Sequence, residues 1–261
     1  MLYALVGWFS FRRHSAYRLA AFGEAVSNTM FGFLRAYILI ALWQSRPGLG
    51  DYTVLDAITF SFLTQALIGP VQIFGGMDLT ERVRTGDVSI DLHRPADLQL
   101  WWLADDLGRA SFTLLARGFV PMVAGWLAFG ILIPSPGRWA AFLLSLLLAV
   151  VVSFALRYLV ALAVFWIHDS RGVEAVMMVC SLFLSGMILP LVTFPGLLGT
   201  VANALPWSAL VQVPADVYLG KRQGWELLDA YAFQAAWALA LIAAGRLLTR
   251  AAHRKLVIQG G

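Results

Sequence analysis

The sequence predicts an all-helical integral membrane protein, and its composition and mean hydropathy are the observations that support this fold class. Of the 261 residues, 60% are apolar and 13% are charged, which is about half the charged fraction of soluble domains. The mean hydropathy is +0.75. Because a folded soluble protein needs charge on its surface, this composition excludes a soluble enzyme, a disordered tail and a DNA-binding module. The bilayer takes the place of water for most of the chain.

Residues 1–18 are expected to form an interfacial helix on the inner membrane face. The segment is too short to span a bilayer, and its aromatic residues suit the headgroup region. Its charges, Arg12, Arg13 and Arg18, follow the apolar stretch, whereas a cleavable signal peptide has the reverse order. We therefore expect residue 1 to remain in the mature protein, inside the cell. The alternative is a charged flank that only orients the first span.

Six apolar segments of bilayer length follow the interfacial helix. A spanning helix requires ~20 residues, and each segment is near or above that length. Turn-forming sequences separate them, such as Ser45–Gly48 and Pro134–Gly137. The predicted spans are 20–44, 54–76, 108–133, 139–167, 174–193 and 227–249. Together they make one transmembrane domain over residues 1–261.

The distribution of basic residues predicts the orientation. With the N-terminus inside, the inner segments hold eleven Lys and Arg residues and the outer segments hold four. This bias places both termini in the cytoplasm. The basic residues lie in short clusters between apolar runs, so they do not indicate a nucleic-acid partner. A single cysteine, Cys180, excludes an intrachain disulfide.

The cytoplasmic connection 77–107 is too long and too charged to be a simple turn. Its residues Glu81, Arg82 and Arg84 are expected on a short helix that Gly86 breaks. An extended piece, 88–93, should follow and stop at Pro95. Because apolar residues recur among the charges, the loop is suited to pressing against a cytosolic surface. The alternative is a solvated loop that skims the membrane.

The outer connection 190–226 is mostly apolar and is interrupted by prolines, including Pro190, Pro195 and Pro206. Irregular apolar backbone cannot face lipid, because its polar groups would have no partners. The segment should therefore form short helices that dip back into the membrane or pack on the spans. It is expected to close the outer end of a pathway or to serve as a purely structural lid.

In order and spacing, these features resemble the permease subunit of the ABC-2 class of ATP-binding-cassette exporters. The resemblance covers nearly the whole chain, from the amphipathic N-terminus to the broken hairpin before the last span. The short motifs that carry the resemblance are Arg84–Asp87 with Leu92–Pro95, Ser185–Pro190 with Pro195, Leu205–Pro206, and Val257–Gly261.

The resemblance implies a coupling helix within residues 79–95 that docks on a separate ATPase subunit. The implied coupling residues are Glu81, Arg82, Arg84, Asp87, Leu92 and Arg94. Pro190, Pro195 and Pro206 would shape a gating re-entrant hairpin. The chain has no GxxxxGK[ST] phosphate loop, so ATP and Mg would be bound by the partner.

The resemblance further implies a second permease chain, identical or related, and export of a hydrophobic or amphipathic compound, such as a drug or an antibiotic. The location implied is the inner, or plasma, membrane of a bacterium. Membrane lipid would be a further partner. The permease would make no covalent bonds, and no catalytic residue or cofactor is expected in it.

Ionisable residues inside the predicted spans are candidates for the translocation path. Arg35, Arg117 and Arg157 fall within spans, where an arginine costs about 2.5–3.5 kcal/mol to insert. They should face a cavity or a partner charge, although Arg117 and Arg157 could instead anchor at the interface. Glu24, near the inner end of its span, is expected to be structural.

Two other classes of protein are weighed against a permease. A membrane-embedded lipid-modifying enzyme would need clustered Asp or His at a membrane face, and Asp105–Asp106 is the only close carboxylate pair. With Arg109 three and four residues on, that pair is more simply a helical ion pair. An ion-coupled carrier would need more acidic residues in the spans. The four histidines lie far apart in sequence, so no metal site is expected.

Overall fold

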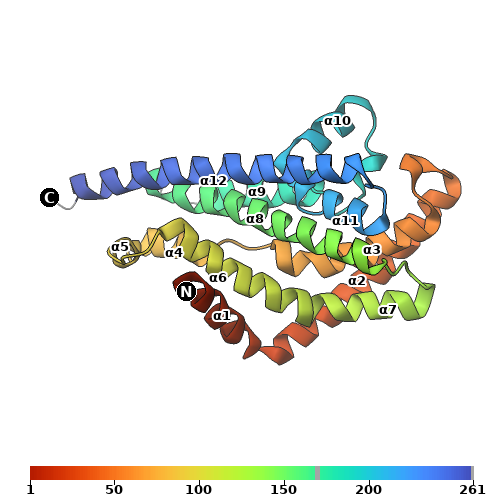
Figure 1. The fold of residues 1–261 in the computed structure, drawn as a ribbon, viewed down its shortest axis with the longest axis horizontal. Helices are drawn as coiled ribbons and strands as arrows, with labels where there is room; N and C mark the ends of the chain where they lie inside the picture. The colour runs from red at the N-terminus through yellow and green to blue at the C-terminus, as the bar shows by residue number, and fades with distance from the viewer. Residues whose placement is uncertain (168–170, 260–261) are drawn as a thin grey trace.

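A computed structural model describes residues 1–167 and 171–259, without the side chains of Leu92, His253 and 255–259. Every regular element among the described residues is helical. Five helices are long and apolar enough to cross a membrane, and they run along the longest axis of the molecule (Figure 1). They are α2 (Arg18–Ser45), α3 (Val54–Val71), α6 with α7 (Leu98–Phe129), α8 (Pro136–Ile167) and α12 (Trp225–Gln259).

The third long helix begins ten residues earlier than the sequence predicts. Helix α6 (Leu98–Thr113) continues through a π-helical turn, Leu114–Gly118, into α7 (Phe119–Phe129). Asp97 starts it as the N-cap, because its Oδ1 accepts from the backbone N–H of Leu100 at 2.8 Å. Residues 98–107 are therefore helix, and the prediction of a loop over 77–107 is wrong in this part.

The fifth predicted span, 174–193, is not one continuous helix. Helix α9 (Arg171–Leu184) has 14 residues, or about 21 Å by helical rise, and by itself it falls short of the hydrocarbon thickness. It ends before Gly186, whose φ of +87° places it in the left-handed region. A Cβ there would lie 2.8 Å from the Gln212 Oε1. The described residues thus contain five helices that are long and apolar enough to cross a membrane, and the sixth span stays a prediction.

Helix α3 lies at the centre of the bundle, between α2, α6–α7, α8 and α11 (Gln212–Leu219). Most of its residues are buried, and its Phe60, Leu63 and Leu67 join the main apolar core with Leu146 of α8. By contrast, α2 exposes a row of large apolar side chains, which suits contact with lipid.

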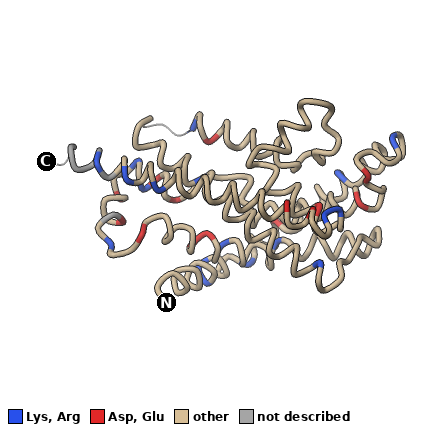
Figure 2. The backbone as a smooth tube through the Cα atoms, turned by 45° about the horizontal axis from the view of Figure 1, so that its top comes forward, with Lys and Arg blue, Asp and Glu red and all other residues tan. Residues whose placement is uncertain are grey.

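The two ends of the molecule differ. Helices α4 (Asp78–Thr85) and α5 (Val88–Leu92) lie at one end together with the last part of α12 (Figure 1). Basic residues recur along that part of α12 (Figure 2). Helix α10 (Gly196–Ala204) and the connection before α3 lie at the opposite end. We call these the α4 end and the α10 end.

Helix α1 (Leu2–Ser15) packs on α6, a contact that sequence analysis did not anticipate. The helices cross where Gly7 faces Gly108, and a Cβ on Gly108 would lie 2.0 Å from the carbonyl oxygen of Gly7. Arg13 adds an ion pair with Asp105 at 3.2 Å. Large apolar residues of α1, including Trp8, stay exposed, which is compatible with the expected interfacial position.

Replacing Gly108 by Ala should separate α1 from α6. The added methyl group has no room, so we expect the protein to lose about 1–3 kcal/mol of stability. Gly23→Ala in α2 is the matched control, because a Cβ at Gly23 meets nothing within 4 Å. Thermal unfolding of detergent-solubilised protein measures both. Equal midpoints for the two variants would contradict the close crossing.

Candidate coupling and translocation site

Helices α4 and α5 form a short hairpin whose apolar side packs on α8. Gly86, with a φ of +85°, ends α4 as the sequence predicts. Leu79 and Val88 are fully buried in a cluster with Phe154 and Tyr158 of α8. The hairpin is thus fixed to a spanning helix by its base.

The expected extended piece, 88–93, is helical instead. The N–H of Ile90 donates to the Asp87 carbonyl at 3.1 Å, and the N–H of His93 donates to the Ser89 carbonyl at 3.2 Å. The alternation of apolar and polar residues resembled a strand, but no neighbouring strand pairs with this segment among the described residues. Local helical hydrogen bonds therefore satisfy its backbone.

Asp91 holds the two helices of the hairpin together through ion pairs inside it. It is buried, and its Oδ1 lies 3.0 Å from Arg82 Nη2 and 3.2 Å from Arg94 Nη1. The Arg94 guanidinium also lies over the ring of Trp101, 5.0 Å from its centroid. Arg82 and Arg94, two predicted coupling residues, are therefore engaged inside this chain. Asp91 is not among the predicted coupling residues, although its spacing of three from Arg94 is a helical ion-pair signal.

The outer face of the hairpin carries the other predicted coupling residues. Glu81 and Arg84 form an exposed ion pair, with Oε1 and Nη2 2.7 Å apart. The hydrogen bond from Arg84 holds the pKa of Glu81 below its usual value. Asp87 is exposed, and so is the Ile90 side chain, at 60%. This face is both charged and apolar; the side chain of Leu92 lies outside the described residues.

The end of α3 leads into the hairpin and is held by α6. Helix α3 ends at Val71, five residues before the predicted end of its span, and Gln72 adopts a φ of +45°. The last carbonyls of a helix lack partners within it. Arg109 supplies these partners, with Nη1 2.7 Å from the Gly69 oxygen and Nη2 3.0 Å from the Pro70 oxygen.

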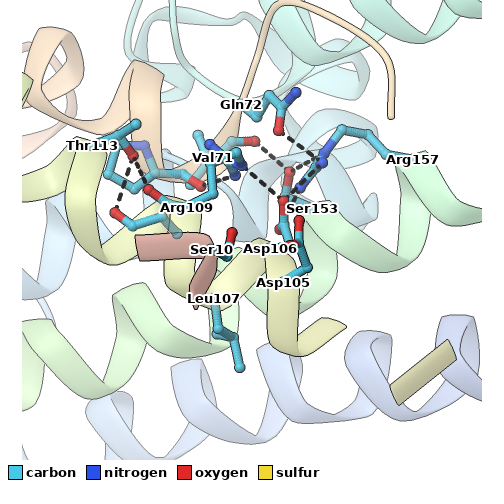
Figure 3. Close-up of polar contacts among 12 residues, drawn as sticks. Ser10, Val71, Gln72, Asp105, Asp106, Leu107, Arg109, Thr113, Ser153 and Arg157 are labelled. Atoms are coloured by element: carbon cyan, nitrogen blue, oxygen red, sulfur yellow. Dashed lines mark hydrogen bonds and ion pairs between the residues drawn. The ribbon is translucent and has the colours of Figure 1, made fainter. Parts of the chain in front are cut away.

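Asp106 joins the end of α3 to α6 and α8. Its Oδ1 accepts from Arg109 Nε at 2.9 Å, and its Oδ2 accepts from Arg157 Nη2 at 2.7 Å. Arg157 Nη1 also donates to Gln72 Oε1 at 3.0 Å. The side chains of Asp106 and Arg157 are each only 6% exposed. The predicted pair of Asp106 with Arg109 is thus one half of a three-residue network (Figure 3).

A cavity of about 850 Å³ opens between α2, α3, α6 and α9. Arg35 and Arg117, two of the three predicted path residues, line it. Arg35 donates to Thr64 Oγ1 at 2.6 Å and to the Ile188 carbonyl at 2.9 Å, while Arg117 forms an ion pair with Glu24.

Arg157 does not reach this cavity. It lines a smaller one, of about 270 Å³, beside the connection from Gln72 to Met77. The third predicted path residue is therefore placed next to the hairpin and away from the large cavity.

A second polar cluster lies near the α10 end. The Tyr52 hydroxyl donates to Asp216, and Gln212 Nε2 donates to that hydroxyl oxygen at 3.0 Å. Gln212 Oε1 accepts from the N–H of Leu191 at 2.8 Å. Burial, together with the Asp216 charge, raises the pKa of Tyr52 well above its usual value. The hydroxyl therefore stays protonated and continues to donate its hydrogen bond to Asp216.

The expected broken hairpin is a chain of short helices. Pro190 precedes a 3-10 turn (Leu191–Thr193), Pro195 caps α10, and Pro206 opens a second 3-10 turn (Pro206–Ala209). Helix α11 follows and is buried along its whole length, against α3 and α8. Short helices packed on the spans are what the sequence predicts; their entry into the membrane stays a prediction.

A comparison with known protein families identifies the family to which this helical bundle belongs. A family model described as "ABC-2 family transporter protein" matches residues 29–260. The chain belongs to this family. Comparisons with curated proteins and with solved structures found no match.

This ABC-2 protein is a multi-pass membrane protein and a permease component of an ABC transporter. Family membership implies association with an ABC ATPase subunit. The resemblance noted in the sequence is thereby confirmed. Within the described part of the chain, no three His, Cys, Asp or Glu residues gather as metal ligands.

Neighbouring carboxylates provide a direct test of the buried network. Asp106→Asn leaves Arg109 and Arg157 buried without a counter-charge, and breaking a buried pair costs about 3–5 kcal/mol. Asp105→Asn removes a partly exposed pair with Arg13, for which we expect at most about 1 kcal/mol. Thermal unfolding in detergent compares the two permease variants. A smaller loss for Asp106→Asn than for Asp105→Asn would refute the network.

Proposed function

We propose that this permease is one half of an ATP-driven exporter that moves a hydrophobic or amphipathic compound, drug-like or antibiotic-like, out of a bacterial cell. A separate ATPase subunit supplies the energy, and a second permease chain, identical or related, completes the pathway. The α4 end and both termini face the cytoplasm, and residues 174–193, with α9, form the sixth crossing. The permease itself hydrolyses nothing.

The hairpin of α4 and α5 carries this proposal. Its base is anchored on α8 by Leu79 and Val88, while Glu81, Arg84 and Ile90 are exposed. Such a face, charged at its rim and apolar in part, suits a protein groove. It is the surface through which an ATPase subunit would push.

The path of the movement follows from the contacts. Closure of the two ATPase subunits favours one position of the hairpins, because their affinity differs between the two states. A displaced hairpin pulls on Gln72, which Arg157 links to Asp106. The displacement of the hairpin is therefore transmitted to α3, α6 and α8 together, and these helices rock as a unit around the cavity.

The contacts of Asp105 and Asp106 favour a permease over a lipid-modifying enzyme. Asp105 pairs with Arg13, and Asp106 pairs with Arg109 and Arg157. Carboxylates held in this way are poor general bases and poor metal ligands, because their lone pairs are occupied. No second function is favoured by a specific contact.

Paired variants of the hairpin separate docking from folding. Glu81→Ala with Arg84→Ala removes an exposed ion pair, so stability should change by less than about 1 kcal/mol. Coupled transport should still fall roughly tenfold, the effect of losing one good interface contact. Transport per ATP hydrolysed, measured in proteoliposomes, reports this loss.

Arg82→Ala is the control for a structural effect. It leaves the buried Asp91 without one of its two partners, so it should lower the unfolding temperature as well as transport. Normal coupling in the Glu81→Ala and Arg84→Ala double variant, with the ATPase still bound, would contradict the docking assignment.

A further inference from the structure

The large cavity holds charge at two depths. Glu24 and Arg35 both line it from α2 and are eleven residues apart, or about 16 Å along the helix. Between them Ser27, Asn28 and Phe31 of α2 line the wall, and Ile68 of α3 adds an apolar contact. The cavity therefore runs from near the membrane surface toward its middle. Its volume of about 850 Å³ is within the range of sites for drug-sized ligands.

The charges around this cavity do not balance. Arg35 contacts a hydroxyl and a carbonyl and pairs with no carboxylate among the described residues. Arg109 shares the single charge of Asp106 with Arg157, and Arg117 has Glu24. Three arginines and one carboxylate, Glu24, thus line the cavity, which leaves an excess of two positive charges. His14, the other titratable group on the wall, removes none of this excess.

One arginine atom is also left without a partner. The Nε–H of Arg117 is buried and donates to no hydrogen-bond partner among the described residues. An unpaired buried donor costs about 1–3 kcal/mol. The rest of the Arg117 side chain, which is 27% exposed and lines the cavity, is what a ligand could contact. Arginine is well suited to this, because its planar fork binds carboxylate, phosphate and sulfonate groups.

We propose that the cavity binds an anionic amphiphile, and that this amphiphile is the exported cargo. Its acidic group is bound by Arg35 and Arg117, and its apolar body lies along Phe31 and Ile68. Glu24 competes with the cargo for Arg117 and therefore weakens binding. This inference rests on the permease function proposed above and narrows its substrate class to acids.

The test uses the permease, co-expressed with its ATPase subunit, in phosphatidylcholine nanodiscs without nucleotide. The probe is 11-(dansylamino)undecanoic acid, whose fluorescence reports binding, and its methyl ester is the uncharged analogue. We expect the acid to bind at least roughly tenfold more tightly than the ester, because a charge-assisted contact is lost in the ester.

Charge variants give effects of opposite sign. Arg35→Gln should weaken binding of the acid roughly tenfold and leave the ester unchanged. Glu24→Gln should strengthen binding of the acid, because it releases Arg117. Arg46→Gln, at an exposed site beyond the end of the same helix, should change neither affinity. If Arg35→Gln does not fold, the gain in Glu24→Gln still tests the proposal.

Three results would overturn the proposal. Equal affinity for acid and ester would remove the need for an anion, and no binding of either probe would mean that a partner chain covers the cavity. Displacement of the acid by phosphatidylglycerol, with no stimulation of ATP hydrolysis by the acid, would assign the site to membrane lipid. Binding of the probe is measured without nucleotide, so it does not depend on the α4–α5 hairpin. If that hairpin does not couple to an ATPase, the affinity for the acid is unchanged, and the proposed function and the proposed cargo are therefore tested separately.

Discussion

The burial of Asp106 between two arginines is the constraint on which the α4 end depends. Removing three charged groups from water costs several kcal/mol for each ion, and only close, well-directed hydrogen bonds offset that cost. Asp106 meets this requirement with both carboxylate oxygens, because Oδ1 accepts from Arg109 and Arg157 and Oδ2 accepts from Arg157. Helices α6 and α8 are thereby fixed at one separation, and the end of α3 is fixed between them.

Arg109 gives this network a second role, because it also lines the large cavity. One guanidinium therefore touches the cavity, the last carbonyls of α3 and the buried carboxylate. A change in cavity charge and a change in hairpin position act on the same side chain. Coupling between the cavity and the hairpin then needs no long series of intermediate residues, because both act on the packed side chain of Arg109.

The apolar runs predicted the positions of α2, α3, α8 and α12, because bilayer-length hydrophobic segments have few alternatives. The fifth segment was equally apolar, yet its helix stops before Gly186, where the chain turns toward Gln212. Hydropathy cannot report such a turn. The partners Arg157 and Asp106 are 51 residues apart, a pairing that one sequence cannot reveal. The short helix that carries Glu81 and Arg84, and its end at Gly86, followed from local pattern alone.

Gln212 fixes the chain near the α10 end in one arrangement through four hydrogen bonds. Its N–H donates to the Ser185 carbonyl, its Oε1 accepts from Leu191, and its Nε2 reaches both Tyr52 and Asp216. A buried amide that loses some of these partners pays for each one left over. Loss of only some of these bonds is therefore disfavoured, so a separation of the segments at this end would have to break all four contacts together, with water replacing them.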